Sequence, residues 1–308
     1  MAGESITAPM VAAPTRPTAS PRSFCKAPSP CENAAMLEVL VAGHYCHDTL
    51  VGKEGVHRVL GGSAAYGGSV LRALGVRFAV AAKVGDDFRY AAEVPAPPRI
   101  VPGARTTSLI DDYTGGERAG TVEAVCEPIL PEDLPGPAQV GLACAIAGEV
   151  PLPTLLRLRA LSRVLLADAQ GLIRAIEPGG RVVHRRLEET PFFAAVESID
   201  YLKISADEAR GMDIEALARR TRVVVTEGAA GCTLLGAGAP VHVPGFAAVE
   251  RDATGAGDCF LAGFAVGLLR GLPPERALRV GNWCGARAVE VVGIPRLRAG
   301  EVERLLRD

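Results

Sequence analysis

The residues best suited to chemistry lie in one short segment, residues 252–264, with the sequence DATGAGDCFLAGF. Gly255, Ala256 and Gly257 carry little or no side chain, so their backbone N–H groups can approach an anion closely. The apolar run that follows predicts a helix, whose first N–H groups lack intrahelical partners and whose dipole favours negative charge. Asp258 follows directly. A carboxylate beside such a turn combines a general base with charge stabilisation, as phosphoryl transfer to a hydroxyl group requires.

The same segment has a purely structural interpretation. The glycine turn would then be a tight strand-to-helix connection, and Asp258 a first-turn acid that stabilises the helix dipole. The complete pattern D-x-T-G-A-G-D, followed by an apolar helix that contains Gly263, favours the catalytic interpretation. This pattern resembles the C-terminal signature of the PfkB (ribokinase-type) carbohydrate kinases, and the resemblance implies that Gly255, Ala256 and Gly257 hold the transferring phosphoryl group while Asp258 activates the acceptor hydroxyl.

The resemblance covers nearly all of residues 37–295. Family members open with G-x-x-x-x-D, whose aspartate holds substrate hydroxyls, and the sequence GHYCHD matches this motif with Asp48. A glycine pair, here Gly61 and Gly62, then begins a helix in which Tyr66 stands where many members have asparagine. The resemblance implies substrate contacts from these four residues, and the tyrosine argues against a furanose substrate. The later sequence KVGDD also matches a strand end of the family.

Metal and nucleotide contacts are implied in the same way. The family's N-x-x-E motif, which orders magnesium-bound water, corresponds to Ser205 and Glu208, with serine replacing asparagine. Thr226 and Gly228 resemble the T-x-G contact to phosphate and ribose, and Asn282 matches a position that borders adenine. Taken singly, Thr226 has the alternative of a strand-end cap, and Asn282 that of a solvated helix residue. The resemblance implies ATP as the donor and Mg²⁺ as its cation.

The residues within these motifs indicate the class of acceptor. GHYCHD, GGSAAY, ADAQGLIR and KISADEA resemble the plant myo-inositol kinases more than ribokinase, fructokinase or adenosine kinase. A polyol ring offers only hydroxyl groups, which a carboxylate such as Asp48 can bind. Asp168 either helps at the same edge or terminates its strand. We therefore expect phosphorylation of myo-inositol to an inositol monophosphate; the alternatives are a kinase for another sugar or a nucleoside, and a non-catalytic PfkB-like regulatory or binding protein.

The elements that must position these residues alternate between strands and helices. Apolar β-rich runs predict strands at residues 37–43, 77–84, 140–146, 163–167, 201–204, 222–226, 232–235 and 241–243. Helical patterns occupy residues 63–74, 152–161, 206–220, 256–270 and 274–292. This order predicts an α/β fold, a ribokinase-like three-layer α/β/α sandwich with a mainly parallel central sheet. Residues 50–60 and 105–125, including Gly115 and Gly116, show β-like alternation without helices and predict a small β lid.

Composition limits the class of protein further. The chain has 308 residues, of which 48% are hydrophobic and 22% charged, as in a globular protein. With a net charge of −2, the chain lacks the overall positive charge that binds nucleic acid or an anionic membrane surface. Eight cysteines without a C-x-x-C pair favour reduced thiols and a cytoplasmic location. No apolar run approaches the ~18 residues that a membrane span needs, and no P-loop motif occurs.

The sequence also bears on the N-terminal segment, on zinc binding and on the partners. Residues 1–36 are rich in alanine, proline and serine, which favours a disordered tail ahead of a kinase domain at residues 37–308; an organelle transit peptide is the alternative. His44, Cys46 and His47 suggest zinc, but structural zinc normally takes four protein ligands.

The partners expected are a small polyol and ATP, with no nucleic acid and no membrane. A monomer and a homodimer are both compatible with a small sheet that has exposed edges.

Overall fold

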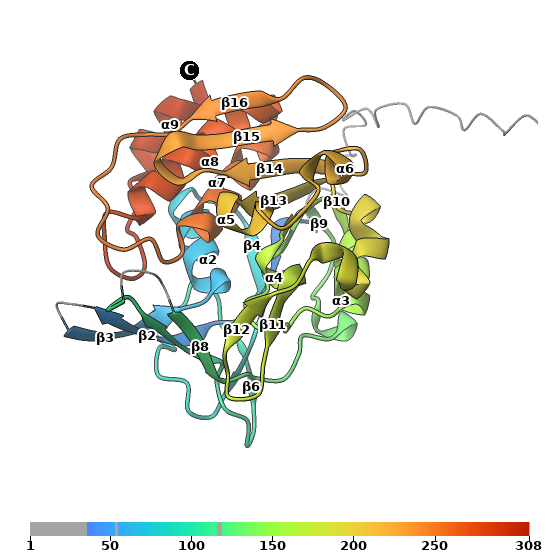
Figure 1. The fold of residues 1–308 in the computed structure, drawn as a ribbon. Coiled ribbons are helices and arrows are strands. Elements are labelled where there is room, and N and C mark those ends of the chain that lie inside the picture. Colours follow the sequence, from blue (N-terminus) through green and yellow to red (C-terminus); the bar gives the residue numbers. More distant parts are fainter. Residues whose placement is uncertain (1–35, 53–54, 116–118, 308) are drawn as a thin grey trace, which may run out of the picture. The chain divides into compact units, whose positions relative to one another are not determined.

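The computed structural model describes residues 36–52, 55–115 and 119–307. Its largest sheet has eight strands in the order β16-β15-β14-β13-β10-β9-β1-β4 (Figure 1). Six neighbouring strands are parallel, namely β4 (Phe78–Ala81), β1 (Leu37–Ala42), β9 (Ala138–Ala143), β10 (Ser162–Asp168), β13 (Tyr201–Ser205) and β14 (Arg222–Thr226). At one side of the sheet, β15 (Gly231–Leu235) is antiparallel to β14, and the edge strand β16 (Val241–Pro244) is antiparallel to β15. The predicted, mainly parallel central sheet is confirmed.

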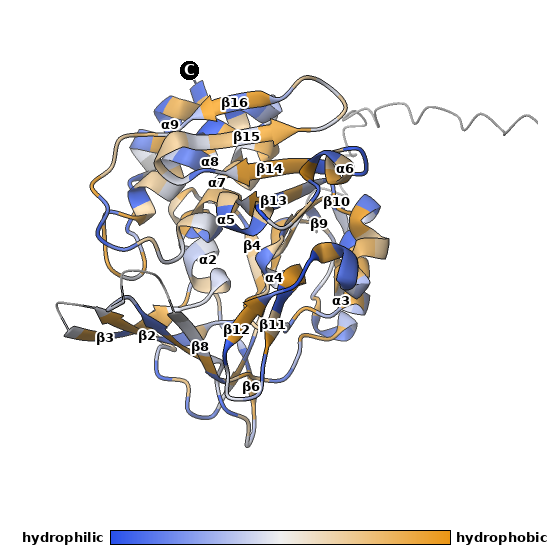
Figure 2. Ribbon diagram, in the orientation of Figure 1, coloured by the Kyte–Doolittle hydropathy of each residue, from blue (hydrophilic) through white to orange (hydrophobic). Residues whose placement is uncertain are grey.

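Helices cover both faces of this sheet because its strands are apolar on both sides. Along β1, Val39 and Val41 belong to one core cluster, whereas Leu40 and Ala42 belong to another, as the two-residue repeat of a strand requires. The first cluster includes residues of α2 (Ser63–Ala73), α7 (Ala256–Leu269), α8 (Pro274–Ala288) and α9 (Ala299–Arg307). The second includes residues of α3 (Leu152–Leu161), α6 (Ile214–Ala218) and the 3-10 helix η3 (Pro191–Ser198). Figure 2 shows the hydrophobic strands between these layers.

A second sheet forms from the two segments that interrupt the alternation. Its order is β3-β2-β7-β8, with β2 (Cys46–Gly52), β3 (Gly55–Gly61), β7 (Ser108–Asp112) and β8 (Ala119–Ala124). One face is apolar: Cys46, Leu109 and Val122 form a buried cluster with Ile146, which follows β9 of the main sheet. The sheet therefore packs against the strand ends of the main sheet, and Figure 1 shows it beside β11 and β12. The predicted small sheet is present; its action as a lid stays a prediction.

Several element boundaries differ from the sequence prediction. The strand expected at residues 77–84 is divided at Ala82 into β4 and β5 (Lys83–Gly85), and β5 pairs with β6 (Arg99–Val101) in a sheet of its own. The helix expected at residues 206–220 is two short helices, α5 (Ala206–Ala209) and α6. Asp213 causes the division, because its side chain accepts a hydrogen bond from the Ala216 N–H and caps a new helix. The helix expected to reach residue 292 ends at Ala288.

Other short elements were not predicted. They are the hairpin β11 (Arg174–Ile176) and β12 (Val182–His184), the helices α4 (Gln170–Ile173) and α9, and the 3-10 helices η1 (Pro131–Asp133), η2 (Leu187–Glu189), η3 and η4 (Gly228–Ala230). The expected tail, apart from Met36, lies outside the described residues, as do Gly116 and the cysteines at positions 25 and 31. Within the described part of the chain, no helix combines the length and apolar character needed to cross a membrane.

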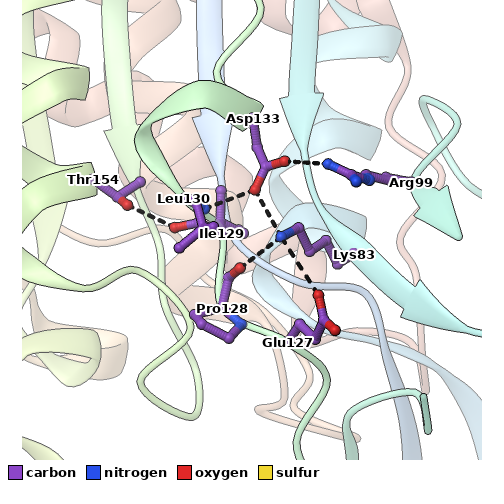
Figure 3. Close-up of polar contacts among 8 residues, drawn as sticks. All are labelled: Lys83, Arg99, Glu127, Pro128, Ile129, Leu130, Asp133 and Thr154. Atoms are coloured by element: carbon purple, nitrogen blue, oxygen red, sulfur yellow. Dashed lines mark hydrogen bonds and ion pairs between the residues drawn. The ribbon is translucent and has the colours of Figure 1, made fainter. Parts of the chain in front are cut away.

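A buried ion pair joins β5, β6 and η1 (Figure 3). Lys83, whose side chain is 4% exposed, places Nζ 2.8 Å from Asp133 Oδ2 and 2.9 Å from the Pro128 carbonyl. The other carboxylate oxygen of Asp133 accepts a bond from Arg99 Nη1 at 2.7 Å. Burial opposes ionisation of Asp133, but the bonds from Lys83, the Leu130 N–H and Arg99 prevail and hold its pKa below the ordinary value. The lysine of the KVGDD motif is thus part of the framework.

We expect Asp133→Asn to lower the free energy of unfolding by about 3 kcal/mol at neutral pH, because the buried Lys83 ammonium then keeps only the exposed Glu127 carboxylate, 3.9 Å away, as a counter-charge. The folded pKa of Asp133 lies below the unfolded value, so its contribution is present at neutral pH and lost as pH falls through the folded pKa. Urea denaturation of both proteins at several pH values measures this. Asp207→Asn, which removes an exposed ion pair with Arg210, is the matched control and should change nothing measurable. Equal effects of the two substitutions would contradict the assignment.

Candidate active site

The candidate site lies where the parallel strands end. β1 is followed by Gly43 and β9 by Cys144, while β10, β13 and β14 end at Asp168, Ser205 and Thr226. Because these strands are parallel neighbours, their carboxyl ends lie along one edge of the sheet, which is where open α/β sheets bind ligands. Three of the predicted motifs therefore meet at this edge without being adjacent in sequence.

The glycine turn is shaped as an anion-binding helix start. Gly255 is the N-cap of α7 with φ 74° and ψ 0°, and Asp252 Oδ1 fixes the turn by accepting bonds from the Thr254 N–H at 3.0 Å and hydroxyl at 2.6 Å. The Ala256 N–H donates to the Ala253 carbonyl at 3.2 Å, so it is used within the turn. The N–H groups of Gly255 and Gly257 make no hydrogen bond to the described residues. They are the donors that the turn offers to an anion.

A buried lysine adds a fixed positive charge to this turn. Lys203 Nζ lies 2.8 Å from Asp168 Oδ2, and a Cβ atom placed on Gly257 would lie only 2.7 Å from Nζ. Burial alone would lower the pKa of Lys203, but the carboxylates of Asp168, Glu208 and Asp258 raise it above the ordinary value, so the ammonium stays protonated. Lys203 is not among the site residues predicted from the sequence. Its signal was a lysine within the otherwise apolar strand YLKIS.

Asp258 faces a pocket that also receives the predicted substrate residues. The pocket encloses about 390 Å³, including the part open to solvent. Predicted residues that line it are Asp48 from β2, Gly62 and Tyr66 at the start of α2, and Gly255 and Asp258 of α7. Ser63, Leu109, Asp111, Ile146, Gln170, Arg174 and Thr254 complete the lining. We call this cavity the acceptor pocket.

Tyr66, one of the predicted substrate residues, packs against the glycine turn. Its ring lies against Gly255, where an added Cβ would fall 2.1 Å from Cδ1. Its hydroxyl is buried and has no hydrogen-bond partner among the described residues. Burial, with the nearby charges of Asp48, Asp252 and Asp258, raises the pKa of Tyr66, so the phenol is neutral. A neutral buried hydroxyl without a partner is suited to bonding a hydroxyl of a ligand.

Gly61 has a different place from the one expected. It does not line the acceptor pocket; instead, a Cβ atom at this position would fall 1.8 Å from Asp48 Oδ2. Glycine therefore leaves the space that the Asp48 carboxylate occupies. Asp168 also lies outside the lining: Oδ2 pairs with Lys203, and Oδ1 accepts the Gln170 N–H at 3.1 Å. Of its two alternatives, the structural role at the strand end fits these contacts.

The predicted metal and nucleotide residues lie beside the pocket rather than in it. Ser205 and Glu208 form a capping box, with Ser205 N bonded to Glu208 Oε2 at 2.9 Å and Glu208 N to Ser205 Oγ at 3.3 Å. Thr226 ends β14, and Gly228 begins η4 with φ 57°. Asn282 is buried and donates to the carbonyls of Val243 and Pro244 at 2.9 and 3.1 Å, so its interpretation as a solvated residue is wrong. The binding roles of these residues stay predictions.

The histidine and cysteine residues near β2 do not form a zinc site. His44 is buried with Nδ1 3.0 Å from Thr107 Oγ1, whereas His47 stacks on Phe88 with ring centroids 5.7 Å apart. Across residues 36–52, 55–115 and 119–307, no group of three or more His, Cys, Asp or Glu residues is arranged to hold a metal ion. The zinc interpretation therefore has no support in this part of the chain.

Comparison with known proteins identifies the class. The fold resembles that of a pyrophosphate-dependent kinase in the ribokinase family, solved with a pyrophosphate analogue and myo-inositol, with a TM-score of 0.72 at 21% identity over 87% of this chain and 100% of that one. The fold is thus ribokinase-like. The chain is also 42% identical over 282 residues to inositol 3-kinase of Zea mays, covering 84% of this chain and 74% of the relative. It is 43% identical over 279 residues to inositol 3-kinase of Oryza sativa subsp. japonica, covering 84% and 70%.

A family profile agrees with these relatives. The profile described as pfkB family carbohydrate kinase matches residues 188–295, which include Lys203, the glycine turn and Asp258. The chain belongs to the pfkB family of carbohydrate kinases, and among its relatives it is similar to the inositol 3-kinases of plants. The resemblance seen in the sequence motifs is confirmed.

Gly255→Ala tests the packing of the anion turn. A positive φ costs a non-glycine residue ~1–2 kcal/mol, and overlap with the Tyr66 ring should add about 1–3 kcal/mol. Gly103→Ala is the matched control, because Gly103 has φ 76° and open space around its Cβ position, so it reports the backbone cost alone. Free energies of unfolding from urea titrations should differ by the overlap contribution. If both substitutions cost the same, Tyr66 does not hold the turn as described.

Proposed function

We propose that this chain catalyses the ATP-dependent phosphorylation of myo-inositol, giving an inositol monophosphate and ADP. One observation carries the proposal: the Asp258 carboxylate, the free N–H of Gly255 and the Asp48 carboxylate of the second sheet border the same pocket. The chain's membership of a carbohydrate kinase family and its similarity to inositol 3-kinases support the choice of reaction and acceptor.

Each part of the site has a task in this reaction. Asp258 removes the proton from the acceptor hydroxyl, and the N–H groups of Gly255 and Gly257 stabilise charge on the transferring phosphoryl group. Lys203 holds a positive charge against the same turn at no cost of reorganisation, because Asp168 already fixes it. Asp48 and Tyr66, which line the same pocket, orient the ring hydroxyls.

The donor and its cation would bind at the neighbouring strand ends. Mg²⁺ commonly takes one or two protein carboxylates and completes its shell with waters and substrate phosphates, so a preformed cluster of ligands is not required. Glu208 fits this pattern. Its Oε2 accepts the Ser205 N–H in the capping box, which leaves Oε1 for water bound to the cation, and its carboxylate lies near Lys203 at the same edge. Ser205 supports Glu208 as its cap. Bound Mg²⁺ would neutralise phosphate charge, while Thr226, Gly228 and Asn282 would position the nucleotide.

Asp258→Asn separates catalysis from helix stabilisation. Loss of the general base should lower kcat by ~10²–10⁴-fold with little change in ATP binding. The matched control is Glu275→Gln, which removes the first-turn acid of α8 and tests the dipole contribution alone. Both variants should lose similar, small amounts of stability, but only Asp258→Asn should lose turnover. Retained turnover in Asp258→Asn would refute the role of Asp258.

An acceptor and donor panel tests the reaction itself. myo-Inositol, ribose, fructose and adenosine are assayed with ATP or pyrophosphate and Mg²⁺, and the phosphorylated product is identified by ³¹P NMR. The proposal requires that myo-inositol with ATP gives the highest kcat/KM. A preference for another sugar or for adenosine would replace the acceptor, and a preference for pyrophosphate would replace the donor. Absence of turnover with every pair would favour the non-catalytic alternative.

Tyr66→Phe tests the acceptor contact. The substitution removes a buried hydroxyl that has no partner among the described residues, so the free energy of unfolding should stay the same or rise. In the complex the hydroxyl bonds the acceptor, so KM for the acceptor should rise by about three- to tenfold while KM for ATP is unchanged. Steady-state kinetics and thermal unfolding measure both effects. An unchanged acceptor KM would mean that the hydroxyl does not reach the ligand.

The same proposal includes a cellular location and an oligomeric state. Six cysteines of the described residues are free and buried, which supports a reducing compartment and a cytoplasmic location. A monomer and a homodimer remain the two predicted states.

A further inference from the structure

The second sheet has a cavity on the face opposite to the acceptor pocket. Side chains alternate along β2, so Asp48 lies on one face with its pairing partner Leu109, and both line the acceptor pocket. His47 and Thr49 lie on the other face, beside Ser108 and Arg58, their partners on β7 and β3. These four residues, with Arg89 and Arg105 from two loops, line the second cavity, of about 550 Å³ including its open part. We call it the outer pocket.

Three arginines without an ion-pair partner among the described residues line the outer pocket. No acidic side chain of residues 36–52, 55–115 or 119–307 lies within ion-pair distance of the guanidinium groups of Arg58, Arg89 and Arg105. Asp48, Asp87 and Glu123 also line the cavity, so its formal charges balance; the Asp87 carboxylate accepts the N–H and hydroxyl of Thr106 at 2.8 and 2.7 Å. Arginine offers a planar set of donors that matches a phosphate group.

A second observation points into the same cavity. Ser108 is 7% exposed, and its hydroxyl is buried without a hydrogen-bond partner among the described residues. Buried polar groups in folded proteins are almost always bonded, so an unpartnered hydroxyl in the wall of a cavity indicates a missing ligand or water. Ser108 pairs with His47 on the sheet and lines the same cavity as the three arginines.

The loops that carry two of the arginines are held in place. Asp86 Oδ2 accepts the Gly103 N–H at 2.6 Å, and Asp87 bonds Thr106, so the loops before Arg89 and Arg105 are tied together. The Arg89 N–H donates to His47 Nε2 at 3.2 Å, while Phe88 stacks on the His47 ring. This bond uses neutral His47 as an acceptor, and burial lowers the pKa of His47 accordingly. The site is therefore largely formed before a ligand binds.

We propose that the outer pocket binds a small phosphate ester that carries free hydroxyl groups. The guanidinium groups of Arg58, Arg89 and Arg105 and the Ser108 hydroxyl bind the phosphate, and Glu123 and Thr49 bind hydroxyl groups of the ester. This mixed lining suits a phosphorylated polyol better than a bare anion. Because the reaction proposed above releases such a compound, this choice of ester rests on that function; the anion site itself does not.

The outer pocket is coupled to the acceptor pocket through β2. Asp48 borders both cavities, since it lies between His47 and Thr49 on one strand. A ligand that fixes the outer face of this strand changes the freedom of the Asp48 carboxylate on the inner face. The proposal therefore includes regulation: occupation of the outer pocket alters KM for the acceptor more than kcat.

Isothermal titration calorimetry with myo-inositol 1-phosphate tests the site, with inorganic phosphate and unphosphorylated myo-inositol as separate probes. The wild-type chain should bind the ester at a site that the triple variant Arg58→Gln/Arg89→Gln/Arg105→Gln weakens by about tenfold or more, and Ser108→Ala should weaken less. Arg157→Gln, an exposed arginine on α3, is the matched control and should bind like wild type. Hydrogen exchange should show protection in β2 and β7 on binding.

The outcomes separate this proposal from the kinase assignment, because binding is measured without turnover. One site that persists unchanged in the triple variant would place the ester in the acceptor pocket alone and overturn the proposal. Equal affinity for inorganic phosphate and the ester would show an anion site without selection for the ester and overturn the choice of ligand. The triple variant should keep its basal kcat and lose any effect of added ester on acceptor KM; an effect that persists would overturn the regulatory part.

Discussion

The site depends on the contact between the Tyr66 ring and Gly255. This contact joins α2, which follows the second sheet, to the first turn of α7, which carries Asp258. Both the positive φ of Gly255 and the space its missing side chain leaves are needed, because a Cβ atom would overlap the ring. On the other side of the turn, Lys203 occupies the space that Gly257 leaves. The two glycines thus let an aromatic ring and an ammonium group approach the same backbone, which fixes where an anion can bind.

Strand β2 explains how one small sheet serves two surfaces. Its inner residues are apolar or acidic and close the acceptor pocket, whereas its outer residues meet arginines from three other segments. A shift of register by one residue would exchange these faces, so the pairing of Asp48 with Val59 and Leu109 must be well specified. Glycine at position 61 contributes, because only a residue without a side chain leaves room for the Asp48 carboxylate.

The sequence predicted those parts of the site that are local. The glycine turn, Asp258, Asp48 and the start of α2 lie in contiguous motifs, and strands with strong apolar patterns, such as β1 and β10, were placed within a few residues. Asp111, Gln170 and Arg174 were missed, since they reach the acceptor pocket only through tertiary packing. The helix expected at residues 206–220 was wrong because the capping side chain of Asp213 competes with an apolar repeat that continues past it. The outer pocket had no local signal, since strand pairing assembles its residues.

The charges around the turn place a condition on the donor. The carboxylates of Asp168, Glu208 and Asp258 lie around Lys203, and Arg174 lines the acceptor pocket with Asp258, so two positive side chains face three negative ones. Two backbone N–H groups and the helix dipole add about half a positive charge, which does not balance this excess. Cations that lower the charge of a polyphosphate therefore favour its binding there. The charge balance of the protein therefore agrees with the proposal that the nucleotide binds together with a metal ion.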